Sequence, residues 1–282
     1  MIVVAGAAGQ LGSAFRSTYP QAAFLSRAEL DLARPETIAP VLDQYRPDVI
    51  INCAAYTKVD QAEDDEELAY LVNALAVGEM ASYAAAKAIP FVTYSTDYVF
   101  DGSSDEPYLE SDETAPINAY GRTKLAGEGL ALAAHPSPLI IRTSWVISGT
   151  HPNFIATILR LAPERELKIV DDQWGNPTIT TDLARATRDA LDAGATGVVH
   201  ITNQGSTTWY ELARAAVGLA GGDVARITAC STQEYPTRAI RPAFSVLESD
   251  RALRLGIPPL PPWQDSLAEV VRQQLVRLAG AP

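Results

Sequence analysis

Tyr120 and Lys124 are the pair of residues whose types and spacing most directly suggest chemistry. They lie four residues apart in "AYGRTK", within a helical pattern, so their side chains would share one helix face. A free phenol has a pKa of about 10 and is a poor proton relay at neutral pH, but a nearby ammonium lowers that pKa. The pair therefore predicts a general acid with its tuning residue, although an exposed tyrosine beside an exposed lysine has the same spacing.

Three glycines near the start of the chain predict a phosphate-binding turn. Gly6, Gly9 and Gly12 stand in "VVAGAAGQLG", between an apolar run and a helical pattern. The first would allow a tight turn, the second would let a pyrophosphate approach the backbone, and the third would allow close packing of helix on sheet. The N–H groups at the helix start also favour phosphate. Dinucleotide binding is therefore expected, the alternative being a glycine-rich loop without a ligand.

The residue that reads the adenosine ribose should follow the second strand, and an acid there selects NAD. This chain has Arg27 after the apolar run "AAFLS". An arginine suits a 2′-phosphate, so we expect NADPH as the cofactor, with NADH also allowed. Alternatively, Arg27 points into water.

Short apolar runs alternate with longer helical patterns along the first half of the chain. The expected strands cover residues 1–6, 22–26, 48–55, 90–96 and 138–147, and the expected helices include 10–19, 35–46, 66–88 and the one with Tyr120. This order predicts an α/β protein with a Rossmann-like, doubly wound parallel sheet. A helix at 181–194 and a strand at 196–202 should return to that sheet.

The regular alternation fails after about residue 148. We therefore expect a dinucleotide-binding domain of residues 1–147 plus about 178–202. A smaller, discontinuous substrate domain would take about 148–177 plus 203–282.

Composition argues against several classes of partner. The formal net charge of −12 disfavours nucleic acid and anionic membranes. Two cysteines without metal spacing and three dispersed histidines argue against zinc and fit a reduced, cytoplasmic setting. Neither a signal peptide nor an apolar run of membrane-spanning length is expected.

Several ordered motifs resemble those of a known family. The glycine turn, "YSTDYVFDG" (94–102) and "AYGRTK" (119–124) resemble the extended short-chain dehydrogenase/reductases. "CAAYTKVDQAE" (53–63), "DDQWGNPT" (171–178) and "RPAFSVL" (241–247) are similar, more specifically, to the dTDP-4-dehydrorhamnose reductases. The resemblance implies NAD(P)H-dependent reduction of the C4 keto group of a nucleotide-linked 6-deoxy-4-keto sugar. It implies conversion of dTDP-4-dehydro-L-rhamnose to dTDP-L-rhamnose, a step of polysaccharide biosynthesis.

The resemblance also implies residue roles. Tyr120 would protonate O4 of the sugar, Lys124 would bind the nicotinamide ribose and lower the phenol's pKa, and Thr96 would polarise the carbonyl. Further cofactor contacts would come from Gly9, Gln10, Leu11, Asp31, Leu32, Ala54, Ala55, Tyr56 and Tyr94. Further substrate contacts would come from Asp97, the backbone around Tyr98 and Val99, and the side chains of Trp145 and Arg241.

Some of these residues have alternative interpretations. Trp145 could be core packing, and Arg241 could pair with an acidic neighbour. Asn73 stands in mid-helix, where asparagine is unfavourable, and is expected to make hydrogen bonds near the sheet at the cofactor site.

One departure from the family bears on metals. Some members dimerise through a carboxylate-bound divalent metal, with a glutamate on the helix after the glycine turn. Residues 13–16 here contain no acid, so we expect no metal, a monomer or metal-independent dimer, and activity without added magnesium.

Two other functions share some of these motifs. A 4,6-dehydratase or 4-epimerase of the same fold is one, but Asp97 is followed by Tyr98 and not by the glutamate that a dehydratase usually carries. A regulatory subunit that binds a dinucleotide without turnover is the other, and the presence of Tyr120, Lys124 and Thr96 speaks against it.

Overall fold

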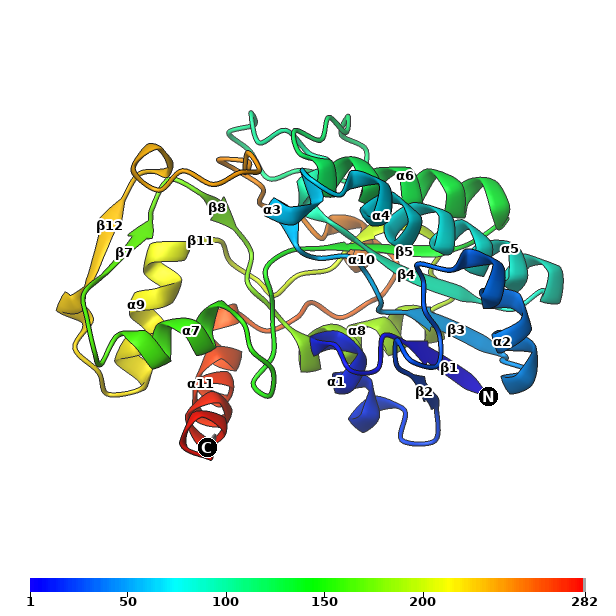
Figure 1. Ribbon diagram of the computed structural model, residues 1–282, viewed down its shortest axis with the longest axis horizontal. Coiled ribbons are helices and arrows are strands. Elements are labelled where there is room, and N and C mark those ends of the chain that lie inside the picture. The colour runs from blue at the N-terminus through cyan, green and yellow to red at the C-terminus, as the bar shows by residue number, and fades with distance from the viewer. Residues whose placement is uncertain (281–282) are drawn as a thin grey trace.

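A six-stranded parallel sheet forms the centre of the larger lobe (Figure 1). The computed structural model describes residues 1–280. The strand order is β10-β5-β4-β3-β1-β2. The strands are β1 (Ile2–Ala5), β2 (Ala23–Leu25), β3 (Val49–Asn52), β4 (Phe91–Thr96), β5 (Leu139–Thr143) and β10 (Gly197–His200). Because β2 and β3 lie on opposite sides of β1, a crevice is expected where the loops after β1 and β3 diverge.

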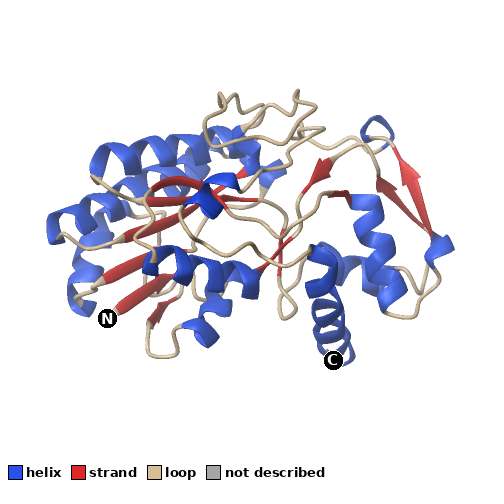
Figure 2. Cartoon of the chain, turned by 180° about the vertical axis from the view of Figure 1, so that it is seen from behind, coloured by secondary structure: helices blue, strands red, loops and turns tan. Residues whose placement is uncertain are grey.

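Helices cover both faces of this sheet, which confirms the predicted doubly wound α/β fold (Figure 2). One face is covered by α1 (Gln10–Thr18) and α8 (Thr180–Asp192), and the other by α2 (Ile38–Tyr45), α5 (Ala76–Lys87) and α6 (Ala119–Ala134). Adjacent residues of β1 face opposite ways, since Val4 packs on the α8 side and Val3 on the α5 side. Burial on both faces explains why the strands read as continuous apolar runs.

The helix predicted over 66–88 is interrupted. It consists of α4 (Glu66–Tyr70), a π-helical turn at Leu71–Leu75, and α5. By length and composition alone, Glu66–Lys87 could cross a membrane, contrary to the expectation that no apolar run is long enough. Half of its most apolar window is buried inside the fold, as in the core helix of a globular domain.

The smaller lobe is built around three helices. These are α7 (Phe154–Leu161), α9 (Trp209–Leu219) and α11 (Trp263–Ala279), which share an apolar core. Short strand pairs flank them: β7 (Leu167–Val170) with β12 (Ile227–Cys230), β8 (Trp174–Gly175) with β11 (Thr207–Thr208), and β6 (Val146–Ile147) with β9 (Thr178–Ile179).

Two details differ from the expected layout. The strand predicted over 138–147 breaks between β5 and β6, where Trp145 has a positive φ of 43°. The short helix α10 (Asp250–Arg254) and Ile257 pack against the core of the larger lobe. We therefore propose that this segment belongs with the dinucleotide-binding lobe and not with the substrate lobe.

Candidate active site

The glycine turn brings two loops of the sheet into contact. Gly6 has a φ of +78°, and a Cβ there would lie 2.6 Å from the backbone nitrogen of Ala54, in the loop after β3. A Cβ on Gly12 would lie 2.2 Å from the carbonyl oxygen of Gly6. No side chain caps the start of α1, and its first turn has no acid. The cradle therefore fits a pyrophosphate, which needs free N–H groups and a close backbone approach.

Gln10, predicted to line the pyrophosphate, uses its side chain elsewhere. Its Oε1 accepts hydrogen bonds from the backbone N–H of Ser148 at 3.0 Å and from Nδ2 of Asn153 at 2.9 Å. Its Nε2 donates to the carbonyl of Val146 at 3.3 Å, and the neighbouring Leu11 is buried. The side chain instead ties the start of α1 to the smaller lobe.

Arg27 lies in solvent, with 78% of its side chain exposed, and pairs with Asp31 at 3.2 Å. Asp31 also accepts a hydrogen bond from the N–H of Ala33, while Leu32 is buried. In the ligand-free chain Arg27 therefore points into water, as its alternative interpretation states. Because exposed ion pairs are weak, Arg27 could exchange its pair with Asp31 for a 2′-phosphate at little cost.

Asn73 makes the predicted hydrogen bonds near the sheet. Its Oδ1 accepts from the N–H of Tyr56 at 2.8 Å, and its Nδ2 donates to the carbonyl of Tyr56 at 3.0 Å and to Oγ1 of Thr123 at 3.1 Å. The side chain is buried and fully used. Asn73 therefore supports the loop of Ala54, Ala55 and Tyr56, and its direct contact with a cofactor stays a prediction.

The side chain and the main chain of Tyr94 point to different places. Its hydroxyl lies 2.7 Å from Oγ1 of Thr187 on α8, so the ring points to the sheet face opposite α6. Its backbone carbonyl accepts a hydrogen bond from Nζ of Lys124 at 2.5 Å. Tyr94 thus reaches the site through its main chain alone.

Helix α6 begins where its sequence predicts. Asn118 caps it by accepting a hydrogen bond from the N–H of Gly121 at 2.8 Å, which sets Tyr120 in the first turn. The ring of Tyr98 lies edge-on to that of Tyr120, with centroids 6.1 Å apart. Thr96, at the carboxyl end of β4, lies close enough to the Tyr120 phenol for its side chain to lower the pKa of that phenol. The structure thus brings together Tyr120, Thr96 and the helix face that carries Lys124.

The protonation of Tyr120 differs from the prediction. Burial and the charge of Asp97 raise the pKa of its phenol, against a lowering by the side chain of Thr96. Lys124 does not lower it in the ligand-free chain, because its ammonium is directed at the carbonyl of Tyr94. Burial lowers the pKa of Lys124 to about 8, and the charge of Glu128 opposes this.

The side chains of Asp97 and Val99 are buried, so the predicted substrate contact near Val99 could involve only its backbone. The Asp97 carboxylate accepts hydrogen bonds from Oγ1 of Thr96 at 2.9 Å and Oγ of Ser245 at 2.6 Å, and burial raises its pKa to about 6. Val99 lies in an apolar cluster, and its carbonyl accepts from the N–H of Ala115. Asp97 is therefore a support beneath Thr96, and Val99 is a core residue.

Trp145 matches its core-packing alternative. Its indole stacks on that of Trp209, with centroids 3.7 Å apart and planes 12° from parallel. Gly175 passes so close that a Cβ there would lie 2.6 Å from the indole. Trp145 is nevertheless only partly buried, so its contact with a sugar stays a prediction.

Arg241 has the acidic neighbour that its alternative requires. Its Nη2 and Nη1 donate to the carboxylate of Asp60 at 2.7 and 3.1 Å. The side chain stays 19% exposed, so some of the guanidinium is still accessible.

Sequence reasoning missed a buried ion pair behind Lys124. Glu128 and Arg142 form two hydrogen bonds of 2.9 and 2.7 Å, and both side chains are almost fully buried. Glu128 follows Lys124 by four residues, so the helical spacing could have revealed it. Arg142 lies on β5 and could not have been paired with it by spacing.

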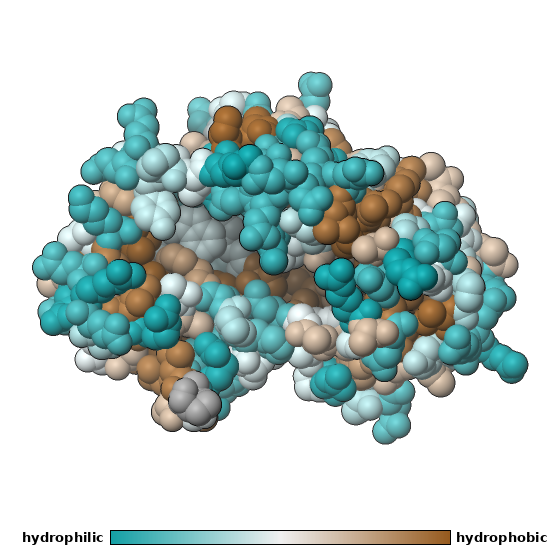
Figure 3. Space-filling view, viewed as in Figure 1, coloured by the Kyte–Doolittle hydropathy of each residue, from teal (hydrophilic) through white to brown (hydrophobic). Residues whose placement is uncertain are grey.

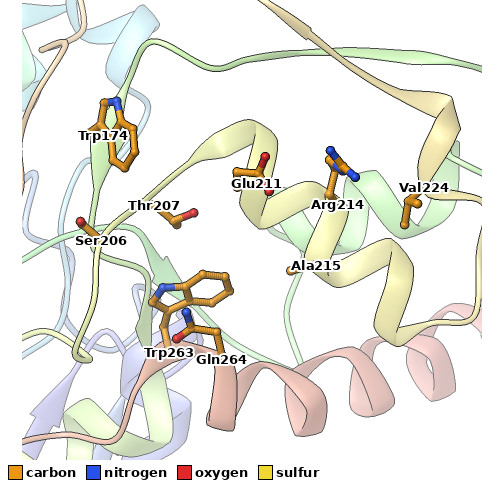
Figure 4. A pocket seen from close by; sticks show the side chains of 9 residues that line it. All are labelled: Trp174, Ser206, Thr207, Glu211, Arg214, Ala215, Val224, Trp263 and Gln264. Carbon is orange, nitrogen blue, oxygen red and sulfur yellow. The ribbon is translucent and has the colours of Figure 1, made fainter.

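The face of the protein that carries the glycine turn is hollowed at its centre, with polar side chains at the rim (Figure 3). A separate cavity of about 520 Å³ lies in the smaller lobe, between β8, α9 and the start of α11 (Figure 4). Its lining residues are Trp174, Ser206, Thr207, Glu211, Arg214, Ala215, Val224, Trp263 and Gln264. Tyr120, Thr96 and Lys124 do not line it. Within residues 1–280 no three His, Cys, Asp or Glu side chains are grouped to hold a metal.

A doubly wound sheet, a glycine turn at its switch point and a Tyr-x-x-x-Lys pair beside a hydroxyl residue define an oxidoreductase of the short-chain dehydrogenase/reductase type. The chain belongs to the family described as the RmlD substrate binding domain, whose model matches residues 1–276.

Three relatives illustrate the match. A dTDP-4-dehydrorhamnose reductase from Burkholderia thailandensis is 44% identical over 97% of this chain and 99% of its own length. A dTDP-4-keto-6-deoxy-D-glucose reductase from Streptomyces niveus is 40% identical over 95% of each chain. The crystal structure of a dTDP-4-dehydrorhamnose reductase from Bacillus anthracis, in complex with NADP, has a TM-score of 0.92 and 34% identity, covering 96% of this chain and 98% of that one.

Proposed function

We propose that this chain uses NADPH to reduce the C4 keto group of a dTDP-linked 6-deoxy-4-keto sugar, with dTDP-4-dehydro-L-rhamnose as the expected substrate. The family and the names of the relatives support this activity. The observation that carries it is the assembly of Tyr120, Thr96 and Lys124 at the carboxyl end of β4, beside the glycine crevice. A cytoplasmic location and a monomer or metal-independent dimer are further parts of the proposal.

The cofactor site follows from the crevice. NADPH supplies the hydride when bound. The turn of Gly6, Gly9 and Gly12 with the start of α1 would hold the pyrophosphate, and Arg27 would hold the 2′-phosphate. Lys124 lies on the helix face of Tyr120 and would bind the nicotinamide ribose.

The role of Tyr120 is to deliver a proton to O4 of the sugar. Its phenol is protonated at neutral pH, which is the state that a general acid requires, although the raised pKa makes it a weaker acid while no cofactor is bound. A sugar alkoxide is more basic than a phenolate, so the transfer stays favourable even from a weakly acidic phenol. The side chain of Thr96 lowers the pKa of Tyr120 and so favours loss of the proton.

The direct test is the absorbance of NADPH and NADH with dTDP-4-keto-6-deoxy-L-mannose and, separately, with its D-gluco epimer. We expect net oxidation of NADPH with the L-sugar, in the presence or absence of EDTA. An epimerase would convert the sugars without net oxidation. Reduction of neither sugar would favour the binding-only alternative.

A further inference from the structure

A strap of the smaller lobe, residues 235–242, reaches across to the larger lobe. It follows β12 and runs toward α3 (Val59–Ala62), where it is seen in orange (Figure 1). The N–H of Ala239 donates to Oδ1 of Asp60 at 3.0 Å, and Arg238 forms an ion pair with Asp64. The carbonyl of Ile240 accepts from Nδ2 of Asn118, the cap of α6, at 2.9 Å. The strap is therefore tied both to α3 and to the start of the helix that carries Tyr120.

Arg241, at the end of the strap, is held in one orientation. Its Nη1 donates both to Asp60 and to the carbonyl of Ala239, each at 3.1 Å, while Nη2 donates to Asp60 at 2.7 Å. These hydrogen bonds involve Nη1 and Nη2, and Nε takes no part in them. Burial and Asp97 raise the pKa of Tyr98, and the charge of Arg241 opposes that rise, so Arg241 lies near the Tyr98–Tyr120 pair.

We propose that Asp60 is a positioning residue for the substrate, which orients Arg241 toward the diphosphate of the nucleotide sugar and fixes the strap to α3. The proposal rests on the proposed function, because it takes a diphosphate as the ligand. A chain with a net charge of −12 needs a local cation to hold an anionic substrate. An arginine held in place before binding loses less conformational entropy on binding than a free one.

The opposite effect of Asp60 is also conceivable on charge alone. If the carboxylate merely neutralised Arg241 and withheld it from the substrate, removing its charge would strengthen substrate binding. The two roles predict changes of opposite sign in the KM for the nucleotide sugar.

The test is Asp60→Asn, which keeps the size of the side chain and one acceptor oxygen. We expect the KM for the nucleotide sugar to rise at least about tenfold, with kcat within about threefold and the KM for NADPH unchanged. Amide hydrogen exchange of peptides covering the strap should become faster. Asp64→Asn is the matched control, since the Asp64–Arg238 pair is half exposed, and it should change the KM by less than about threefold.

A lower KM in Asp60→Asn would show that Asp60 withholds Arg241 and would overturn the proposal, as would an unchanged KM with unchanged exchange. The proposed function can fail separately, if the wild type reduces no 4-keto sugar. Calorimetric binding of dTDP then decides the role of Asp60. Weaker binding by Asp60→Asn than by Asp64→Asn supports the positioning role, and equal binding contradicts it.

Discussion

At the scale of single residues, the environment of Tyr120 keeps its phenol protonated in the ligand-free chain. Burial and Asp97 disfavour the phenolate, which also makes the phenol a weaker acid. Lys124 is directed at the carbonyl of Tyr94 on β4, and in the free chain its charge is not used on the phenol. Its expected partner is the ribose of the cofactor, which would bring that charge to the reacting centre only when the cofactor is bound.

Lys124 should limit activity at high pH. Its pKa is lowered by burial to about 8, so the ammonium is present below that pH and lost above it. We expect kcat/KM for reduction to be level below about pH 8 and to fall above it, since kcat/KM reports groups of the free enzyme. Lys124→Arg keeps the charge and should remove the fall within the range where the protein is folded. A fall at the same pH in this variant would assign the titration to another group.

Asp97 should make stability depend on pH. Burial raises its pKa from 3.8 to about 6, so the stability it contributes is present at low pH and is lost as the pH rises through about 6. Asp97→Asn cannot ionise. Its free energy of unfolding, relative to wild type, should rise by about 1–2 kcal/mol between about pH 5 and pH 8, measured by urea unfolding. If the free energy of unfolding of Asp97→Asn, relative to wild type, stayed flat or fell over this range, the raised pKa of Asp97 would be contradicted.

At the scale of elements, the glycine turn depends on contacts that a side chain would destroy. In Gly12→Ala the added Cβ would lie 2.2 Å from the carbonyl oxygen of Gly6, so the turn must shift. We expect at least about a tenfold rise in the KM for NADPH, because the backbone can no longer approach the pyrophosphate.

Gly129→Ala is the matched control for that change. Gly129 lies in α6, and a Cβ there has no heavy atom of another element within 4 Å. This variant should keep the KM for NADPH and gain about 0.5–1 kcal/mol of stability by thermal unfolding. Equal cofactor binding by both alanine variants would show that the turn does not hold the cofactor.

The periodicity of the sequence predicted the strands of the main sheet, the alternating helices and the Asn118 cap, because each depends on neighbouring residues. It did not predict the π-helical turn that turns Asn73 toward the loop of Tyr56, nor the break in the strand at Trp145. Both are imposed by distant segments: the loop that bonds Asn73, and the indole of Trp209 that stacks on Trp145.

At the scale of the whole molecule, polar contacts between distant segments join the two lobes around the hollow. Gln10 bonds Asn153, Ser245 bonds Asp97, and Arg241 bonds Asp60. Partners so far apart in the chain share no spacing that a single sequence reveals. For this reason the roles of Asp97, Trp145 and Arg241 were only partly predictable, whereas Tyr120 and Lys124 could be found from their separation on one helix.

Turnover by Tyr120→Phe, compared with the wild type, tests the central claim most directly. The change removes only the hydroxyl, so NADPH binding, followed by titration, should be retained. With dTDP-4-keto-6-deoxy-L-mannose, we expect kcat for NADPH oxidation to fall at least about a hundredfold, because the general acid is lost. Turnover equal to that of the wild type would contradict the assignment of Tyr120 as the proton donor.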